Sequence, residues 1–439
     1  MKARLIPVHF DREKGKTFDR QLQTLTDLLG DCAEMLEPVA LGEPLPKGDA
    51  VVLPHLQGRA YHQLDDLKAI DLPILIITTG FGTISMWDWE IISYLKAEGV
   101  ETIAPYNLDQ ARSVCAALGA RRRMAGGKFL VFIANPGDAA RASRAAHFYW
   151  RQAECSRRIT EKFGTSIVMK DLEALGAEAQ EISDEEAEET WGKWRWPTEG
   201  IDGRPVLSAV KMYIAIKREV DDDPTICGVG VNCLGASRFS NTTPCLAWCM
   251  LYEEKQLMWG CEADTMSMLS EHILHKSLGA PIMMTNIYPF LMGDAALKHE
   301  RIDRFPDVQG DPANHILAVH CGYMGVIPKS FATEWTLRKK VLAMVHDNAT
   351  AVDARFPTGA VTLAKIDPTL SKMVVAEGEL KGYAQFPNSD CLNGGIMEIR
   401  DGHKLMALVL SHHYLIMAGH NLPSIRMIAK VFGLEVVEI

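Results

Sequence analysis

Residues 259–264, Trp-Gly-Cys-Glu-Ala-Asp, place two carboxylates between a short apolar run and a longer apolar-periodic stretch. Acids at the start of a helix commonly cap its N–H groups, and this role explains Asp264 well. It explains Glu262 less well, because the flanking Trp, Gly and Cys indicate a buried loop. The next apolar strand ends on the carboxamide of Asn286. Glu262 and Asn286 are therefore the first candidates for functional side chains.

Histidines stand at the ends of two further apolar runs. Asn-His-Ile-Leu-Ala-Val-His-Cys-Gly (314–322) has His315 and His320 at the two ends of a predicted strand. Ser-His-His-Tyr-Leu-Ile-Met-Ala-Gly-His-Asn (411–421) begins with His412 and His413 and closes with His420. Neighbouring side chains of an extended chain face opposite ways, so only one of the adjacent pair is expected to enter a given site.

These separated segments together predict a metal site. An acid from one strand end, an oxygen donor from the next and a distant histidine form a mixed oxygen and nitrogen ligand set for a hard divalent cation. The carboxyl ends of parallel strands are where α/β proteins place their sites. We therefore expect these residues to follow parallel strands.

The elements that must position them alternate between strand and helix. In the first third, strand-like runs lie at 4–10, 50–56, 73–80 and 101–105. Helical stretches lie between them near 17–30, 86–98 and 107–121. A second alternating unit follows Gly126 and Gly127, with strands at 128–138, 165–172 and 225–233 and helices within 139–164 and 205–220. Such alternation predicts parallel sheets covered by helices. The acidic segment 183–200 is expected to be a solvated helix or loop.

From about residue 345 the pattern changes to alternating β, with strands at 360–367, 372–382 and 395–402. The fold class is therefore predicted to be α/β, with two Rossmann-like parallel-sheet domains followed by a smaller β-rich, barrel-like domain. The predicted limits are 1–125, 126–340 with Glu262 and Asn286, and 341–439 with the final histidines.

Composition narrows the class of protein. The 439 residues are 47% hydrophobic and carry a formal charge of −10, with no basic stripe beyond Arg121, Arg122 and Arg123. Nucleic acid is therefore an unfavourable partner. No window reaches the roughly 18 apolar residues of a membrane helix, and the N-terminus lacks a signal-peptide pattern. We expect a cytoplasmic protein that binds neither nucleic acid nor membrane.

Two other cofactor classes are disfavoured by spacing. The ten cysteines stand mostly singly inside apolar runs, as reduced core thiols do. Cys245 and Cys249 form one helical step, and no second matching pair completes a zinc site. The glycine-rich loops at 80–83 and 228–235 lack the GxGxxG that opens a dinucleotide-binding helix.

From about residue 225 onwards the chain resembles the L-fucose isomerase and L-arabinose isomerase superfamily. The likeness is carried by four segments: 243–269 (TPCLAWCMLYEEKQLMWGCEADTMSML), 279–286 (GAPIMMTN), 318–322 (AVHCG) and 411–439 (SHHYLIMAGHNLPSIRMIAKVFGLEVVEI). The resemblance implies a three-domain aldose–ketose isomerase that uses a divalent metal, usually manganese.

In fucose isomerases a glutamate, an aspartate and a C-terminal histidine hold the metal, and the two carboxylates move the proton of an ene-diol mechanism. The resemblance places the glutamate at Glu262 and the histidine at His412 or His413. The aspartate position is occupied by Asn286. An amide oxygen can still face a metal or a sugar hydroxyl, but it cannot act as a base. The resemblance therefore predicts an altered site with one ligand charge fewer.

Three functions remain open. The first is a metal-dependent isomerase or epimerase with Glu262 as base and His315, His320, Asp264 or a bound water as the second proton relay. The second is another reaction on a sugar or sugar acid. The third is a non-catalytic sugar-binding or oligomer-forming relative.

Substrate and partner residues complete the expectations. Asn232, Arg238 and Asn241 are expected in the loop after the strand at 225–233, where they could bind sugar hydroxyls, and Lys329 could face an anionic group. Trp87 and its neighbours in Ser-Met-Trp-Asp-Trp-Glu (85–90) are expected to form a lid or an interface, because exposed tryptophans are otherwise hard to justify. In the resembling family one subunit closes the pocket of its neighbour, which implies a homo-oligomer, often a hexamer.

Overall fold

The computed structural model describes residues 1–11, 13–56, 58–134, 149–201, 203–320, 323–386, 389 and 393–439. The chain divides into two compact units. Unit 1 contains residues 1–125, 276–279 and 423–435, and unit 2 contains residues 126–275, 280–422 and 436–439. Cys321, Cys391 and residues 139–148 of the helix expected within 139–164 lie outside the described residues.

Unit 1 is built on a parallel sheet of strand order β2-β1-β4-β5-β6, with β3 also paired to β1. Its strands are β1 (Ala3–His9), β2 (Ala33–Met35), β3 (Val39–Ala40), β4 (Ala50–Leu53), β5 (Ile74–Ile76) and β6 (Thr102–Ile103). Its helices are α1 (Lys16–Leu29), α2 (Leu64–Lys68), α3 (Asp88–Ala97), α4 (Leu108–Met124) and most of α14 (Leu422–Val431). The inner strands β4 and β5 are fully buried, as expected for a sheet covered by helices, whereas β2 and β3 are only partly buried.

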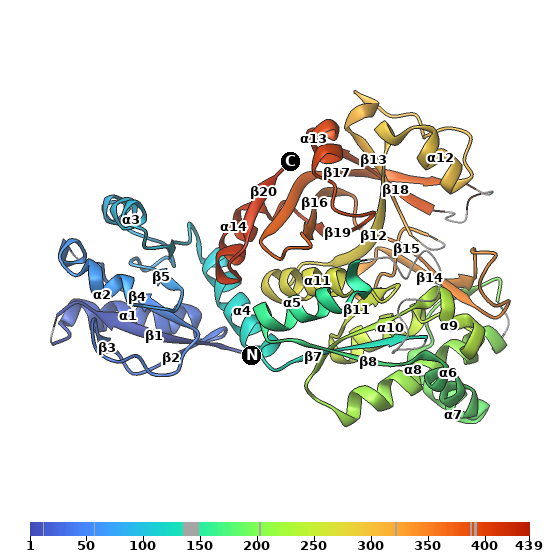
Figure 1. Cartoon of the computed structure of the whole chain (residues 1–439), viewed down its shortest axis with the longest axis horizontal. Coiled ribbons are helices and arrows are strands. Elements are labelled where there is room, and N and C mark those ends of the chain that lie inside the picture. Colours follow the sequence, from blue (N-terminus) through green and yellow to red (C-terminus); the bar gives the residue numbers. More distant parts are fainter. Residues whose placement is uncertain are drawn as a thin grey trace. The chain divides into compact units, whose positions relative to one another are not determined.

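Unit 2 contains a second parallel sheet of order β11-β10-β7-β8. Its strands are β7 (Lys128–Ile133), β8 (Ser166–Asp171), β10 (Ile226–Val231) and β11 (Met258–Cys261). The helices around it are α5 (Ala153–Phe163), α6 (Leu172–Glu181), α7 (Asp184–Trp194), α8 (Gly203–Asp222), α9 (Cys233–Ser240), α10 (Cys245–Lys255) and α11 (Thr265–Leu278). Helices α5 and α11 lie on one face and α6 and α8 on the other (Figure 1).

The acidic segment 183–200 forms a solvated helix for most of its length, as predicted. Ser183 caps α7 by accepting a hydrogen bond from the Glu186 amide, and Ala187 is the buried residue of the helix. Its carboxylates are exposed, and Asp184, Glu186 and Glu189 form surface ion pairs with Lys211, Arg218 and Lys193.

Most of the remaining strands of unit 2 form a closed sheet. Six strands follow the order β16-β19-β12-β13-β18-β17, and pairing of β16 with β17 closes them into a barrel, with β20 added at β17. These strands are β12 (Ile282–Pro289), β13 (His315–Val319), β16 (Gly359–Ile366), β17 (Lys372–Gln385), β18 (Asn393–Ile399), β19 (His413–Ala418) and β20 (Glu435–Glu438). Helices α12 (Asp294–Glu300) and α13 (Gly402–Leu408) belong to this part, and β9 (Thr198–Glu199), β14 (Glu334–Lys339) and β15 (Thr350–Arg355) form a separate small sheet.

This topology corrects one expectation about the site. Asn286 was predicted to follow a parallel strand, but β12 pairs antiparallel with both β13 and β19. The apolar run of β12 is buried along its whole length, which is a pattern that parallel and barrel strands share. Sequence periodicity therefore could not distinguish them, and the partners of β12 come from much later in the chain.

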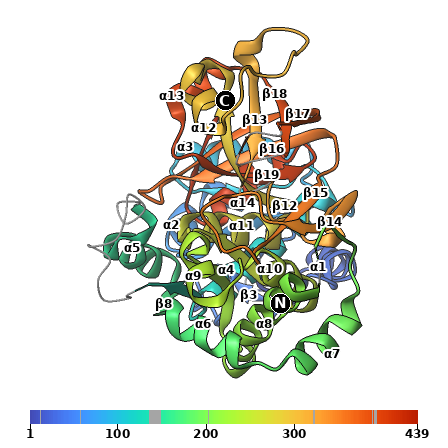
Figure 2. The same cartoon turned by 90° about the vertical axis from the view of Figure 1, so that its right-hand side faces the viewer.

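Helix α11 connects the two sheets of unit 2, and Figures 1 and 2 show it between them. On one side Met268 packs against β11 at Gly260, where a Cβ atom would lie 2.5 Å from the methionine sulfur. On the other side the Ser270 hydroxyl accepts a hydrogen bond from the Ile366 amide of β16 at 3.2 Å. The start of α11 is thus held against both the parallel sheet and the barrel.

Candidate metal centre

The turn between β11 and α11 carries Glu262. Both Glu262 and Ala263 adopt left-handed backbone conformations, with φ of +54° and +58°. Such conformations cost non-glycine residues roughly 1 kcal/mol or more each, and they persist where the surroundings hold them. Here the Ala263 amide donates to the Val231 carbonyl at 3.0 Å, and the Asp264 amide donates to the Cys261 carbonyl at 3.0 Å. The fixed turn presents the Glu262 carboxylate at the end of the parallel sheet.

Glu262 meets two histidines from the start of β19. One carboxylate oxygen of Glu262 and one ring nitrogen each of His412 and His413 all lie within 4.8 Å of one another. The Nε2 atom of His413 is 4.0 Å from the Glu262 carboxylate. Glu262 and His413 are buried, and His412 is partly buried. One carboxylate and two imidazoles at this spacing are donors that could hold a divalent ion.

The expectation that only one of the adjacent histidines could enter the site is wrong. Strand β19 begins at His413, so His412 precedes the pleated strand and is not bound by its alternation. The two rings lie 4.0 Å apart between centroids at an angle of 47°. Both can therefore contribute a nitrogen to one site.

Asp264 fixes the orientation of His413. Its carboxylate lies 2.9 Å from Nδ1 of His413, which we assign as the protonated nitrogen, and this leaves Nε2 with a lone pair directed to the Glu262 side. Nε2 has no hydrogen-bond partner among the described residues. A histidine ligand held through its other nitrogen by a carboxylate is a common arrangement around protein-bound metals.

Asp264 is fully buried and charged. Burial alone would raise its pKa, but the charge of Lys365 and the hydrogen bond from His413 lower it below the ordinary value for an aspartate. The Lys365 ammonium lies 3.2 Å from the carboxylate and also donates to the Ser267 hydroxyl at 2.5 Å. The Ser267 amide and hydroxyl donate to Asp264 at 2.8 Å each. Asp264 therefore acts as the helix cap that the sequence predicted and, in addition, holds the His413 ring in place.

His412 is neutral over the physiological range. Burial, followed by the nearby His413, lowers its pKa to about 3. A neutral imidazole keeps the lone pair that a metal requires, and the site therefore needs no proton release from His412 to bind an ion at neutral pH.

Strand pairing places Asn286 beside the cluster of Glu262, His412 and His413. It lies directly opposite His413 across the β12–β19 ladder, where side chains are neighbours. The side chain is buried, and its Oδ1 atom has no hydrogen-bond partner among the described residues. A buried carbonyl oxygen without a donor is costly unless it binds something that the protein alone does not supply.

His320 borders the same group, whereas His315 and His420 do not. The His320 ring is 5.7 Å from that of His413, and neither of its nitrogens has a hydrogen-bond partner among the described residues. Burial and the two neighbouring histidines lower its pKa to about 3. His315 stands at the other end of β13 with Nδ1 against the Asp311 carbonyl, and His420 is exposed with Nε2 against the Gly378 carbonyl.

The predicted substrate residues occupy mixed positions. Asn232 directly follows β10 and precedes α9, beside the β11 strand that leads to Glu262. Arg238 and Asn241 were expected in a loop, but Arg238 is an exposed residue of α9 and Asn241 ends that helix with a left-handed φ of +58°. Asparagine tolerates this conformation well, so Asn241 has a backbone role. Lys329 is exposed, and Trp87 is an exposed residue of unit 1.

The sequence did not single out two residues that complete the centre. Lys365 is the buried counter-charge of Asp264. Its position as a lysine inside the apolar run 360–367 is the sequence feature that could have indicated a buried charge. Trp150 packs its ring 5.2 Å from that of His413 between centroids. Neither could be placed without knowledge of the sheet pairing.

Comparison with known proteins does not supply an assignment, since neither a family model nor a curated sequence matches the chain. Among the described residues, no helix has the length and apolar character needed to cross a bilayer.

Proposed function

We propose that the protein is a metal-dependent sugar aldose–ketose isomerase, or a related epimerase, with an altered metal site. The observation that carries the proposal is the convergence of Glu262, His412 and His413 within 4.8 Å, at a position where Asp264 orients one ligand. The resemblance of residues 225–439 to the fucose and arabinose isomerase superfamily supports the choice of reaction.

The donor set fits a divalent ion of the manganese type. Glu262 supplies a carboxylate oxygen, His412 and His413 supply ring nitrogens, and Asn286 can add an amide oxygen. The buried Oδ1 of Asn286 and the Nε2 atom of His413, which have no hydrogen-bond partner among the described residues, are atoms that such an ion would engage. When bound, the ion would polarise the carbonyl and hydroxyl oxygens of an open-chain sugar.

The chain itself would move the protons. Glu262 takes the proton from C2 and returns it to C1 of the resulting ene-diol, since Asn286 cannot act as a base. His320, which is neutral, can exchange the proton between the two sugar oxygens by accepting at one nitrogen and donating at the other. Asp264 is less suited to this relay because both of its oxygens already accept hydrogen bonds.

Asn286 also favours a second candidate function. The loss of one carboxylate relative to the resembling enzymes fits a different reaction on a sugar or sugar acid, or a sugar-binding protein without turnover. Retention of manganese together with deuterium uptake distinguishes the isomerase from both of these.

Three further expectations remain part of the proposal. The first is the layout in three domains with limits at residues 125/126 and 340/341. The second is contact of a sugar with Asn232, Arg238, Asn241 or Lys329, of which Asn232 is nearest in sequence and register to the Glu262 turn. The third is a homo-oligomer formed with the aromatic surface around Trp87.

Metal analysis combined with a sugar screen tests the proposal. Protein loaded with Mn²⁺ should convert at least one pentose, deoxyhexose or substituted sugar to the ketose, with deuterium from solvent entering at C1 or C2. Glu262→Gln should lose this conversion by about 10²-fold or more, because the general base is gone. Glu334→Gln, at an exposed position of β14, is the matched control. Undiminished turnover after complete metal removal would exclude the proposed reaction.

A further inference from the structure

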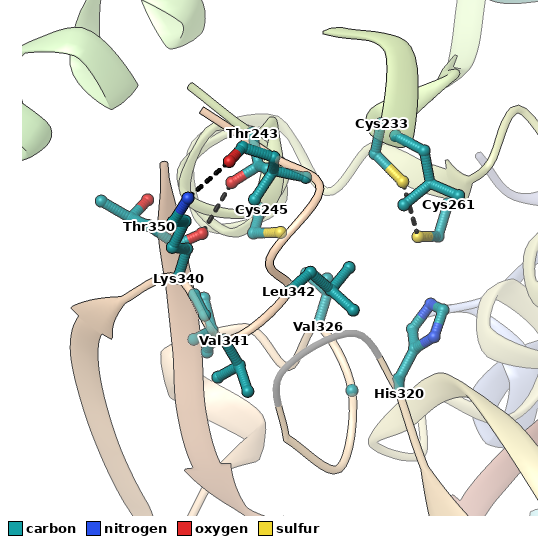
Figure 3. A pocket seen from close by; sticks show the side chains of 15 residues that line it. Cys233, Thr243, Cys245, Cys261, His320, Val326, Lys340, Val341, Leu342 and Thr350 are labelled. Atoms are coloured by element: carbon teal, nitrogen blue, oxygen red, sulfur yellow. Dashed lines mark hydrogen bonds between the residues drawn. The ribbon is translucent and has the colours of Figure 1, made fainter. Parts of the chain in front are cut away.

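Two buried cysteine thiols lie in contact beside the candidate metal centre. The Sγ atoms of Cys233 and Cys261 are 3.4 Å apart. Both residues line a partly open pocket whose wall also contains Cys245 and His320 (Figure 3). Their side chains are almost entirely buried in the protein, yet the pocket gives a small molecule a route towards them. The pair thus differs from an isolated core thiol, which would be inert.

The parallel register of the sheet creates this contact. Val231 of β10 lies beside Cys261 of β11, and Cys233 follows two residues after Val231 as the first residue of α9. The end of β11 and the start of α9 therefore present two thiols to the same pocket. The residue after Cys261 is Glu262, whose left-handed backbone carries the carboxylate of the metal centre. A change at Cys261 is thereby passed directly to Glu262.

We propose that Cys233 and Cys261 form a reversible disulfide under peroxide and that this modification weakens metal binding. One thiol is oxidised by hydrogen peroxide to a sulfenic acid with release of water. The second thiol then attacks that sulfur, forms the S–S bond and releases a second water. The two thiols together lose two electrons and two protons, which reduce the peroxide.

The bond requires the two sulfur atoms to approach from 3.4 Å to about 2.05 Å. Cys261 ends its strand against a turn already held in an unfavourable conformation, so the movement is expected to be taken up at Glu262. Displacement of Glu262 separates it from His412 and His413. This consequence rests on the proposed metal site, whereas formation of the disulfide does not.

The experiment compares reduced and peroxide-treated full-length protein. Peptide mapping should find Cys233 joined to Cys261, and intact mass should show the loss of two hydrogens. Mn²⁺ affinity, measured by electron paramagnetic resonance of the free ion, should fall by roughly 10–100-fold, as for other losses of support around a metal, and return after reduction with a dithiol.

Matched variants separate the possible results. Cys233→Ser, or Cys233→Ala if the serine variant folds poorly, should keep its Mn²⁺ affinity after peroxide. Cys245→Ser, in the same pocket, should respond as the wild type does. A disulfide between other cysteines, or an unchanged affinity after the Cys233–Cys261 bond has formed, would overturn the proposal. Failure of the reduced protein to bind Mn²⁺ would remove the metal centre itself, while peptide mapping would still decide whether the bond forms.

Discussion

At the scale of single residues, Asp264 links stability to the metal centre. Asp264→Asn should leave the buried Lys365 without its counter-charge and lower the free energy of unfolding by about 3–5 kcal/mol. Mn²⁺ affinity should fall about 10–100-fold, because His413 loses the group that orients it. Urea unfolding and metal titration measure the two effects.

A double variant separates these roles of Asp264. Asp264→Asn combined with Lys365→Met removes both buried charges and should recover much of the lost stability. It should not recover the Mn²⁺ affinity. Recovery of both would mean that Asp264 acts on the centre only through general stability.

Asn286 has the opposite expected effect on the metal. Asn286→Asp adds a negative charge opposite His413 and should tighten Mn²⁺ binding by at least about tenfold, or 1.4 kcal/mol. Asn348→Asp, outside the cluster, is the control in the same titration. If the affinity of Asn286→Asp matches that of the wild type, Asn286 does not belong to the centre.

At the scale of elements, the close packing of α11 on β11 positions the Glu262 turn. Gly260→Ala would place a Cβ atom 2.5 Å from the Met268 sulfur, so the buried Met268 side chain or the two elements themselves must shift. The free energy of unfolding should fall by about 1–3 kcal/mol. Gly192→Ala in α7, where a Cβ atom meets nothing within 4 Å, should instead raise it by about 0.5–1 kcal/mol. Equal urea stability of Gly260→Ala and the wild type would argue against this packing.

The order of the elements was largely predictable. The strands and helices predicted in residues 1–125 and 126–234 are present where the structure describes them, because apolar periodicity is a local property. The short elements β2, β3 and α2 and the helix α6 were not predicted. Strand pairing is not local. Strand β12 joins β19, more than a hundred residues later, and its burial pattern alone is compatible with either a parallel or an antiparallel partner.

At the scale of the whole molecule, unit 1 exposes several large apolar side chains to solvent. Phe81, Met86 and Trp87 are 80%, 66% and 73% exposed. If this surface joins copies of the chain, Trp87→Ser should lower the molar mass measured by light scattering at micromolar concentration. Met344→Ser, at a 67% exposed methionine of unit 2, should leave the mass unchanged. A wild-type protein that is monomeric at all concentrations would contradict this assembly.

The barrel begins earlier than the β-rich region predicted from about residue 345, because β12 and β13 belong to it. The sequence by itself determined the α/β class and Glu262, Asn286, His412 and His413 as candidates. These follow from periodicity and from polar residues that interrupt apolar runs. Only the tertiary structure decided that both histidines face Glu262 and that Lys365 and His413 meet at Asp264. In the sequence, Lys365 and His413 lie 101 and 149 residues from Asp264. Contacts across such separations depend on barrel closure and strand register, which local patterns do not encode.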